Sequence, residues 1–255
     1  MENNKIRQEN RKALPKYLLV LWGAGLFGGV MGFLIGFAGH HNMGAHVVEM
    51  LNGFFTKITP WSLPVTSVVL LGAGWQRYCK AKRLFAVWDG EEEDTADRAE
   101  RQLDWVLLLT TIQILLDFFF LAAAVVYWVP GKLTILVEIG CFLASIAVII
   151  LIQQRVVDLT RRLNPEKQGS IYDLKFKKKW MDSCDEAEQK QIGQAAYKAY
   201  NVLNAACPIV WVMLMFASFL FEISLLPAFV LVVLWGILNV SYIVECIRMN
   251  RRPMT

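Results

Sequence analysis

The sequence predicts an all-α integral membrane protein: a polytopic bundle of six transmembrane helices with two cytoplasmic helical-hairpin extensions, built as a single domain over residues 1–255. Hydrophobic residues make up 56% of the chain, against about 45–50% in soluble domains. They are concentrated in six runs that carry at most one acidic charge each. Each run is close to the roughly 20 residues that a helix needs to cross the hydrocarbon core. The predicted spans are about 17–39, 59–76, 105–128, 133–153, 200–221 and 226–246.

The basic residues predict the orientation of the chain. All 26 Lys and Arg residues except Lys57 and Lys132 lie before the first run, after the sixth, or in two hairpin tips at about 77–104 and 154–199. Cytoplasmic loops carry such an excess, so we expect a multi-pass protein of the cell membrane with both termini in the cytoplasm. Basic groups along a membrane face favour contact with the anionic lipid of the inner leaflet rather than with nucleic acid.

The first span contains a glycine every three or four residues, which predicts one bare seam along the helix. Such a seam lets a neighbouring backbone approach closely. We expect the seam to pack against another helix of the bundle; self-association is the alternative, and the oligomeric state stays open. The packing glycines are Gly25, Gly29, Gly32 and Gly36.

The second, third and fourth spans are separated by two clear breaks. Trp61 and Trp75 suit the two interfaces around the second span. Its helix is expected to continue into the cytoplasm as far as "WDGEEED", where acidic residues favour the start of the next helix. "VPGK" turns the third span into the fourth. The fourth helix also continues past the membrane, and Asn164-Pro165 is expected to end it.

The last two spans follow a long polar segment. Ser183 and Glu186 match a capping box, which predicts that a helix starts near Cys184 and runs without a break into the fifth span. Pro227 fits the first turn of the sixth span.

Within the polar segment, the stretch "SIYDLKFKKKWMDS" combines aromatic residues with four lysines. Rings and ammonium groups of this kind suit the headgroup zone of an anionic leaflet. We expect Lys175 and the lysines at 177–179 to act as a group, with Trp180 as an anchor. The alternative is a docking surface for a cytoplasmic protein.

The sequence contains no motif of a catalytic or cofactor site, so we expect a non-enzymatic protein without a cofactor. Its histidines lie together in "GHHNMGAH", in a predicted exterior loop, where they could bind copper or zinc. An ordinary polar loop is the preferred interpretation. The three histidines are His40, His41 and His46. The five cysteines show no metal-ligand spacing and none lies in an exterior loop, so no disulfide is expected.

Two acidic residues lie within the predicted spans. Asp117 is the deeper one, and Thr110, Gln113 and Asp117 share one face of the third span. Glu138 lies near the start of the fourth span and could face Asp117 across the "VPGK" turn. An intramembrane acid is a candidate site for a proton or cation. A hydrogen-bonded acid that serves packing is the preferred interpretation.

The polar segment resembles the signature of a family of bacterial membrane proteins, mostly Gram-positive, known as domain of unknown function number thirty-one sixty-nine. The similar stretches are "NPEKQGSIYD", "FKKKW", "SCDEAEQ" and "AAYKAY". The resemblance implies a polytopic membrane protein over nearly the whole chain, and it implies no activity and no role for any residue. The matching residues are Asn164, Pro165, Glu166, Lys167, Gly169, Ser170, Tyr172, Asp173, Trp180, Ser183, Cys184, Asp185, Glu186, Ala187, Glu188, Tyr197 and Lys198.

Two functions from different classes fit these observations. The first is a non-enzymatic membrane protein that binds lipid or a cytoplasmic partner through its hairpin tips, in regulation, envelope stress or self-protection. The second is the membrane-spanning subunit of a transporter driven by a separate ATPase, which rests on an analogy of topology alone.

Overall fold

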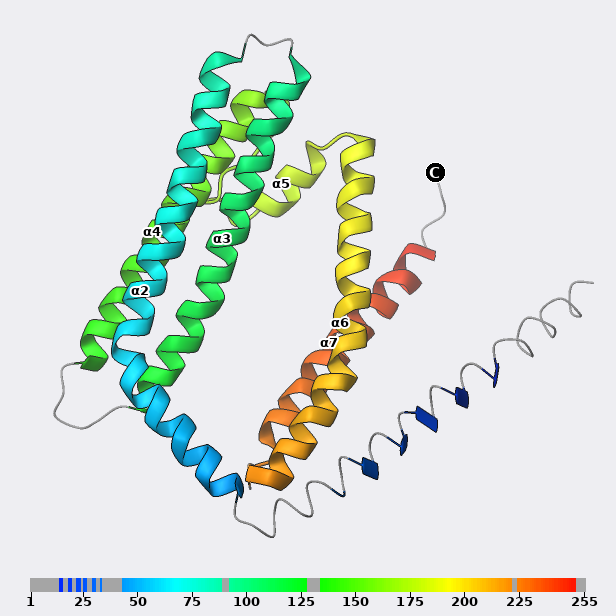
Figure 1. The fold of residues 1–255 in the computed structure, drawn as a ribbon. Coiled ribbons are helices and arrows are strands. Elements are labelled where there is room, and N and C mark those ends of the chain that lie inside the picture. The colour runs from blue at the N-terminus through cyan, green and yellow to red at the C-terminus, as the bar shows by residue number, and fades with distance from the viewer. Residues whose placement is uncertain are drawn as a thin grey trace, which may run out of the picture. The chain divides into compact units, whose positions relative to one another are not determined.

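The computed structural model of the chain describes residues 43–88, 92–127, 134–221 and 224–250, together with isolated positions between 14 and 33. Every regular element in this part of the chain is a helix (Figure 1). The all-α prediction is therefore confirmed. The helices are α2 (Met43–Val87), α3 (Glu93–Val126), α4 (Thr134–Leu163), α5 (Phe176–Asp182), α6 (Glu186–Phe221) and α7 (Leu226–Asn250).

Five of these helices, α2, α3, α4, α6 and α7, are long and apolar enough to cross a membrane. They contain the second to sixth predicted spans. The chain is therefore a multi-pass membrane protein. The first predicted span, 17–39, lies largely outside the described residues.

Helix α2 begins earlier than the sequence indicates. Residues from Met43 onward were expected to lie in an exterior loop, but they already form the first turns of α2. The helix then continues through Pro60 and Pro64, each of which removes one backbone hydrogen bond. Prolines mislead a sequence-based boundary here because transmembrane helices tolerate them better than helices in water.

The chain divides into two compact units, residues 51–194 and residues 1–50 with 195–255. In the first unit, α2, α3 and α4 share one hydrophobic core. This core reaches well beyond the predicted spans, because Ala81, Ala99 and Leu159 belong to it. The extensions are thus amphipathic helices that bury their apolar faces against one another.

In the second unit, α6 and α7 are joined by polar side chains. Tyr200 donates a hydrogen bond to Asn239 at 2.8 Å, and Trp235 donates one to Asn204 at 2.6 Å. The rings of Tyr200 and Tyr242 stack with their centroids 4.5 Å apart. These contacts hold the two helices as a hairpin.

Candidate functional site

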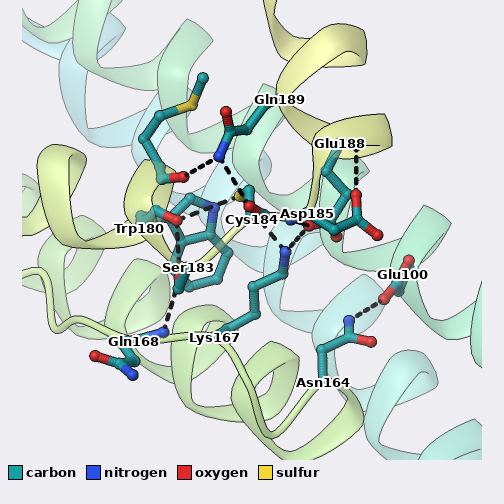
Figure 2. Close-up of polar contacts among 11 residues, drawn as sticks. Glu100, Asn164, Lys167, Gln168, Trp180, Ser183, Cys184, Asp185, Glu188 and Gln189 are labelled. Atoms are coloured by element: carbon teal, nitrogen blue, oxygen red, sulfur yellow. Dashed lines mark hydrogen bonds and ion pairs between the residues drawn. The ribbon is translucent and has the colours of Figure 1, made fainter. Parts of the chain in front are cut away.

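The polar segment 164–189 folds around a buried lysine. Lys167 has only 4% of its side chain exposed, and its ammonium group forms an ion pair with Glu188 and donates a hydrogen bond to Cys184 Sγ at 3.5 Å (Figure 2). Asn164 places it there: α4 ends at the preceding residue, and the backbone N–H of Lys167 donates to the Asn164 carbonyl at 3.1 Å. A buried ammonium group without such partners would be strongly unfavourable.

Glu188 also caps helix α6. The backbone N–H of Glu188 donates to Asp185 Oδ1 at 2.7 Å, and the N–H of Asp185 donates to Glu188 Oε2 at 3.1 Å. This reciprocal pair is a capping box. One carboxylate therefore serves both the start of α6 and the buried ammonium group of Lys167.

The predicted capping box, Ser183 with Glu186, is wrong by two residues. Ser183 has other partners, because its hydroxyl accepts the N–H of Gln168 at 3.1 Å and donates to the Trp180 carbonyl at 2.8 Å. Asp185 takes the capping position instead, so α6 begins at Glu186 rather than near Cys184.

The charge state of Lys167 follows from its partners. Burial acts to lower the pKa of its ammonium group, but the hydrogen bonds and charges of Glu188 and Cys184 outweigh burial, and the pKa is raised. The lysine is therefore positively charged throughout the neutral range, and the pair with Glu188 is ionic.

The segment then folds back along α4. Gln154 Oε1 accepts the backbone N–H of Ile171 at 2.9 Å and the hydroxyl of Ser170 at 3.0 Å. Gln154 lies nine residues before the end of α4 at Leu163, or about 14 Å along the helix. The chain thus leaves the end of α4 and returns to the level at which the fourth predicted span ends.

Asp173 organises the next turn. Its carboxylate accepts the backbone N–H of Lys175 at 2.9 Å and pairs with the ammonium group of Lys179. The Lys179 hydrogen bond, followed by that of the Lys175 N–H, lowers the pKa of Asp173. Among the four lysines that were grouped together, Lys179 is thus the one held in an ion pair of the segment itself.

The outward face of the segment is both apolar and basic. Tyr172 is 65% exposed and Leu174 is fully exposed. Lys175, Lys177 and Lys178 are exposed beside them.

Trp180 does not lie on this outward face. It is half-buried, packs on Phe176 with ring centroids 5.5 Å apart, and lines a cavity of about 290 Å³. The cavity is walled by α3, α4 and the folded segment, and Lys167 and Cys184 also line it. Across it, Asn164 donates to Glu100 Oε1 at 2.6 Å (Figure 2).

The family model described as "Protein of unknown function (DUF3169)" matches residues 11–246. The chain belongs to this family. The match confirms the resemblance seen in the polar segment, and the family description assigns no activity. No curated protein and no solved structure matches the chain.

The structure brings together about half of the residues that resemble the family pattern. Those that meet around Lys167 contribute to the ion pair, the cap or the cavity wall, whereas Pro165, Glu166 and Glu186 are exposed. The residues that meet are Asn164, Lys167, Trp180, Ser183, Cys184, Asp185 and Glu188.

Gly169 is a pattern residue with a conformational role. Its φ is +126°, a region that L side chains rarely adopt, and a Cβ at this position would lie 2.9 Å from Phe176 Cδ2. We expect Gly169→Ala to lower the free energy of unfolding by about 1–3 kcal/mol, because it adds backbone strain and a steric contact. Unfolding of the purified protein by sodium dodecyl sulfate measures this.

Gly193→Ala is the matched control for that prediction. A Cβ at Gly193 would meet nothing within 4 Å, and the residue lies inside α6. Equal losses at the two positions would contradict a conformational role for Gly169.

A second polar cluster lies between the apolar parts of α2, α3 and α4. Thr110, Gln113 and Asp117 are all fully buried, as expected for residues on one inward face. Asp117 accepts hydrogen bonds from Gln113 Nε2 at 2.7 Å and from Ser145 Oγ at 2.6 Å. Sequence reasoning missed Ser145 and its neighbour Ser67, since serines inside apolar runs carry no distinctive spacing.

Glu138 is buried as well, with 2% of its surface exposed, and its Oε2 has no hydrogen-bond partner among the described residues. It was expected to face Asp117. The α4 residue that contacts Asp117 is instead Ser145, which lies seven residues, or about 10 Å, further along the helix. The two helices run antiparallel from a turn at 128–133, which places Asp117 opposite residues deeper in α4 than Glu138.

The remaining predicted site residues stay apart from both clusters. His46 lies exposed in α2, and His40 and His41 fall outside the described residues. Within the described ranges, no group of three His, Cys, Asp or Glu residues could hold a metal ion.

The glycine seam stays a prediction. A Cβ at Gly25 or Gly29 would meet nothing within 4 Å, and Gly32 and Gly36 lie outside the described residues.

Proposed function

We propose that the chain is a six-span, non-enzymatic protein of the bacterial cell membrane, with both termini and the extensions of α2, α3, α4 and α6 in the cytoplasm. Its folded segment 164–189 binds the anionic lipid of the inner leaflet. The five membrane-length helices and the apolar run at 17–39 support the span count. The distribution of Lys and Arg supports the orientation.

The return of the segment to Gln154 is the observation that carries the lipid-binding proposal. The hydrogen bonds of Ser170 and Ile171 to Gln154 place the following residues at the level where α4 leaves its apolar run. The exposed Tyr172 and Leu174 then lie where apolar groups enter the interface, and the neighbouring lysines lie where they meet headgroup charge. Each lysine near an anionic surface contributes about 1 kcal/mol.

A spin label at Leu174 tests this proposal in the full-length protein. A Leu174→Cys variant without native cysteines is labelled with a nitroxide and placed in bilayers of phosphatidylglycerol or phosphatidylcholine. In anionic bilayers the label should collide with oxygen dissolved in lipid and be shielded from a water-soluble nickel chelate. It should be exposed to the chelate in neutral bilayers, and also in high salt, because the Debye length is only about 8 Å at physiological ionic strength.

Two sets of substitutions sharpen the experiment. Changing Lys175, Lys177 and Lys178 to Gln should expose the label to the chelate in anionic bilayers. Changing Lys80 and Lys82, which are exposed on the α2 extension, should leave it shielded. A label that meets the water-soluble chelate in both lipids would contradict lipid binding, and docking of a cytoplasmic protein on this face would then be the better account.

A further inference from the structure

Asp117 belongs to a closed ring of hydrogen bonds that joins three helices. Gln113 Nε2 on α3 donates to Asp117 Oδ1 at 2.7 Å and to Ser67 Oγ on α2 at 2.9 Å. Ser67 donates to Ser145 Oγ on α4 at 3.3 Å, and Ser145 donates to Asp117 Oδ2 at 2.6 Å. Every donor of the ring therefore leads to the carboxylate.

The ring contains no positive charge to balance that carboxylate. Residues 58–76 of α2 are uncharged. On α4, the nearest titratable side chains are Cys141 and Glu138, about one and two turns from the residue that contacts Asp117, and on α3 the nearest is Asp104, more than three turns away. An ionised carboxylate in the apolar part of a membrane protein is costly without a compensating charge.

The spacing of the ring atoms favours a proton over a metal ion as that charge. Oxygen ligands bind hard cations such as calcium at about 2.3–2.6 Å, which keeps neighbouring ligand atoms more than about 3.3 Å apart. The successive distances around the ring, 2.7, 2.9, 3.3 and 2.6 Å, are those of direct hydrogen bonds. The ring thus has room for a hydrogen atom between its members.

A buried polar track leads from the ring toward one end of the apolar region. Gln153, near the end of the fourth predicted span, donates to Thr110 Oγ1 at 3.2 Å, and Thr110, Gln113 and Asp117 follow on one buried face of α3. Midway along this face, Gln113 Oε1 is buried and has no hydrogen-bond partner among the described residues. Such an orphan acceptor in a polar track is the place for a water molecule or a hydronium ion.

We propose that Asp117 is a proton-binding site, reached along Thr110 and Gln113 from the side at which Gln153 lies. A hydronium ion gives its proton to Asp117 Oδ2 and leaves as water. The protonated oxygen then donates to Ser145 Oγ, and the hydroxyls of Ser145 and Ser67 rotate, so that this side of the ring reverses its direction. Gln113 continues to donate to Oδ1 in both states, and the net charge of the site changes from minus one to zero.

Infrared spectroscopy of the full-length protein in bilayers tests the proposal directly, because it detects a buried carboxyl group without a reagent. The spectrum of Asp117→Asn is subtracted from that of the unsubstituted protein across a range of pH. We expect a carbonyl band of the protonated acid that grows as the pH falls and follows a single-site titration. A band that is present at every pH, or at none, would overturn the proposal.

Two further arms exclude the remaining accounts. Gln113→Leu removes a donor to the carboxylate, so it should move the titration to higher pH by about one to two units. Thr111→Ala, on the exposed side of the same helix, should leave it unchanged. At fixed pH, replacing choline chloride by sodium chloride should not alter the band; loss of the band in sodium would mean that a sodium ion takes the proton's place and would refute the proton site.

Discussion

Glu188→Gln is expected to lower the free energy of unfolding by about 2–3 kcal/mol. Gln keeps the shape of the capping box, so the substitution removes mainly the negative charge that balances Lys167, which is only 4% exposed. Breaking a buried ion pair from one side costs about 3–5 kcal/mol. We expect less here because Glu188 is 38% exposed and solvent screens part of the interaction.

The controls for this prediction lie within the same segment. Glu186→Gln changes an exposed acid in the first turn of α6 and should cost less than about 1 kcal/mol. Combining Glu188→Gln with Lys167→Met should recover part of the loss, since an apolar side chain needs no counter-charge. If Glu188→Gln and Glu186→Gln behave alike in unfolding by sodium dodecyl sulfate, the buried pair is not a major source of stability.

The cost of Glu188→Gln should also depend on pH in one direction. The pKa of Lys167 is raised above the ordinary value of 10.5 by its partners. A group whose pKa is higher in the folded state stabilises it fully below the unfolded value, and that stabilisation is lost as the pH rises through the folded value. The difference between the two proteins should therefore be constant through the neutral range and shrink only in strong alkali.

Leu159→Ala is expected to lower the free energy of unfolding by about 2–5 kcal/mol, the usual range for truncating a buried leucine. Leu159 is 3% exposed and belongs to the core shared by α2, α3 and α4, in a part of α4 that runs beyond its predicted span. Truncation there both removes buried apolar surface and leaves a cavity.

Leu151→Ala is the matched control on the same helix. Leu151 is 55% exposed and lies within the predicted span, where lipid rather than water would surround it. Little transfer energy is lost when a side chain already faces hydrocarbon, so the change should cost less than about 1 kcal/mol. Equal losses at 151 and 159 would contradict a packed core in the extension.

Much of the fold could be predicted from local patterns. Apolar runs of membrane length predict the long helices, because each run bounds its own helix whatever it packs against. Asn164-Pro165 correctly predicts the end of α4 at Leu163, since the residue before a proline avoids helical geometry. The periodicity of α3 likewise predicts the shared inward face of Thr110, Gln113 and Asp117.

The candidate site depends on contacts between distant residues, which local patterns do not reveal. Lys167 lies in a highly charged stretch, where a lysine is expected to be exposed. Its burial depends on Glu188, which belongs to the following helix. The capping box was misplaced for a similar reason, because the competing partners of Ser183 include the N–H of Gln168, fifteen residues away.

The two arms of the folded segment are joined by cross-links that do not pass through its tip. Gln168 bonds to Ser183, and Lys167 pairs with Glu188, while the exposed lysines at 177 and 178 lie on the chain between these contacts. The segment is therefore a closed clasp whose backbone is redundant at its outermost point. A chain cut between Lys177 and Lys178 would keep both ends in place, so this position suits a split reporter or an inserted tag.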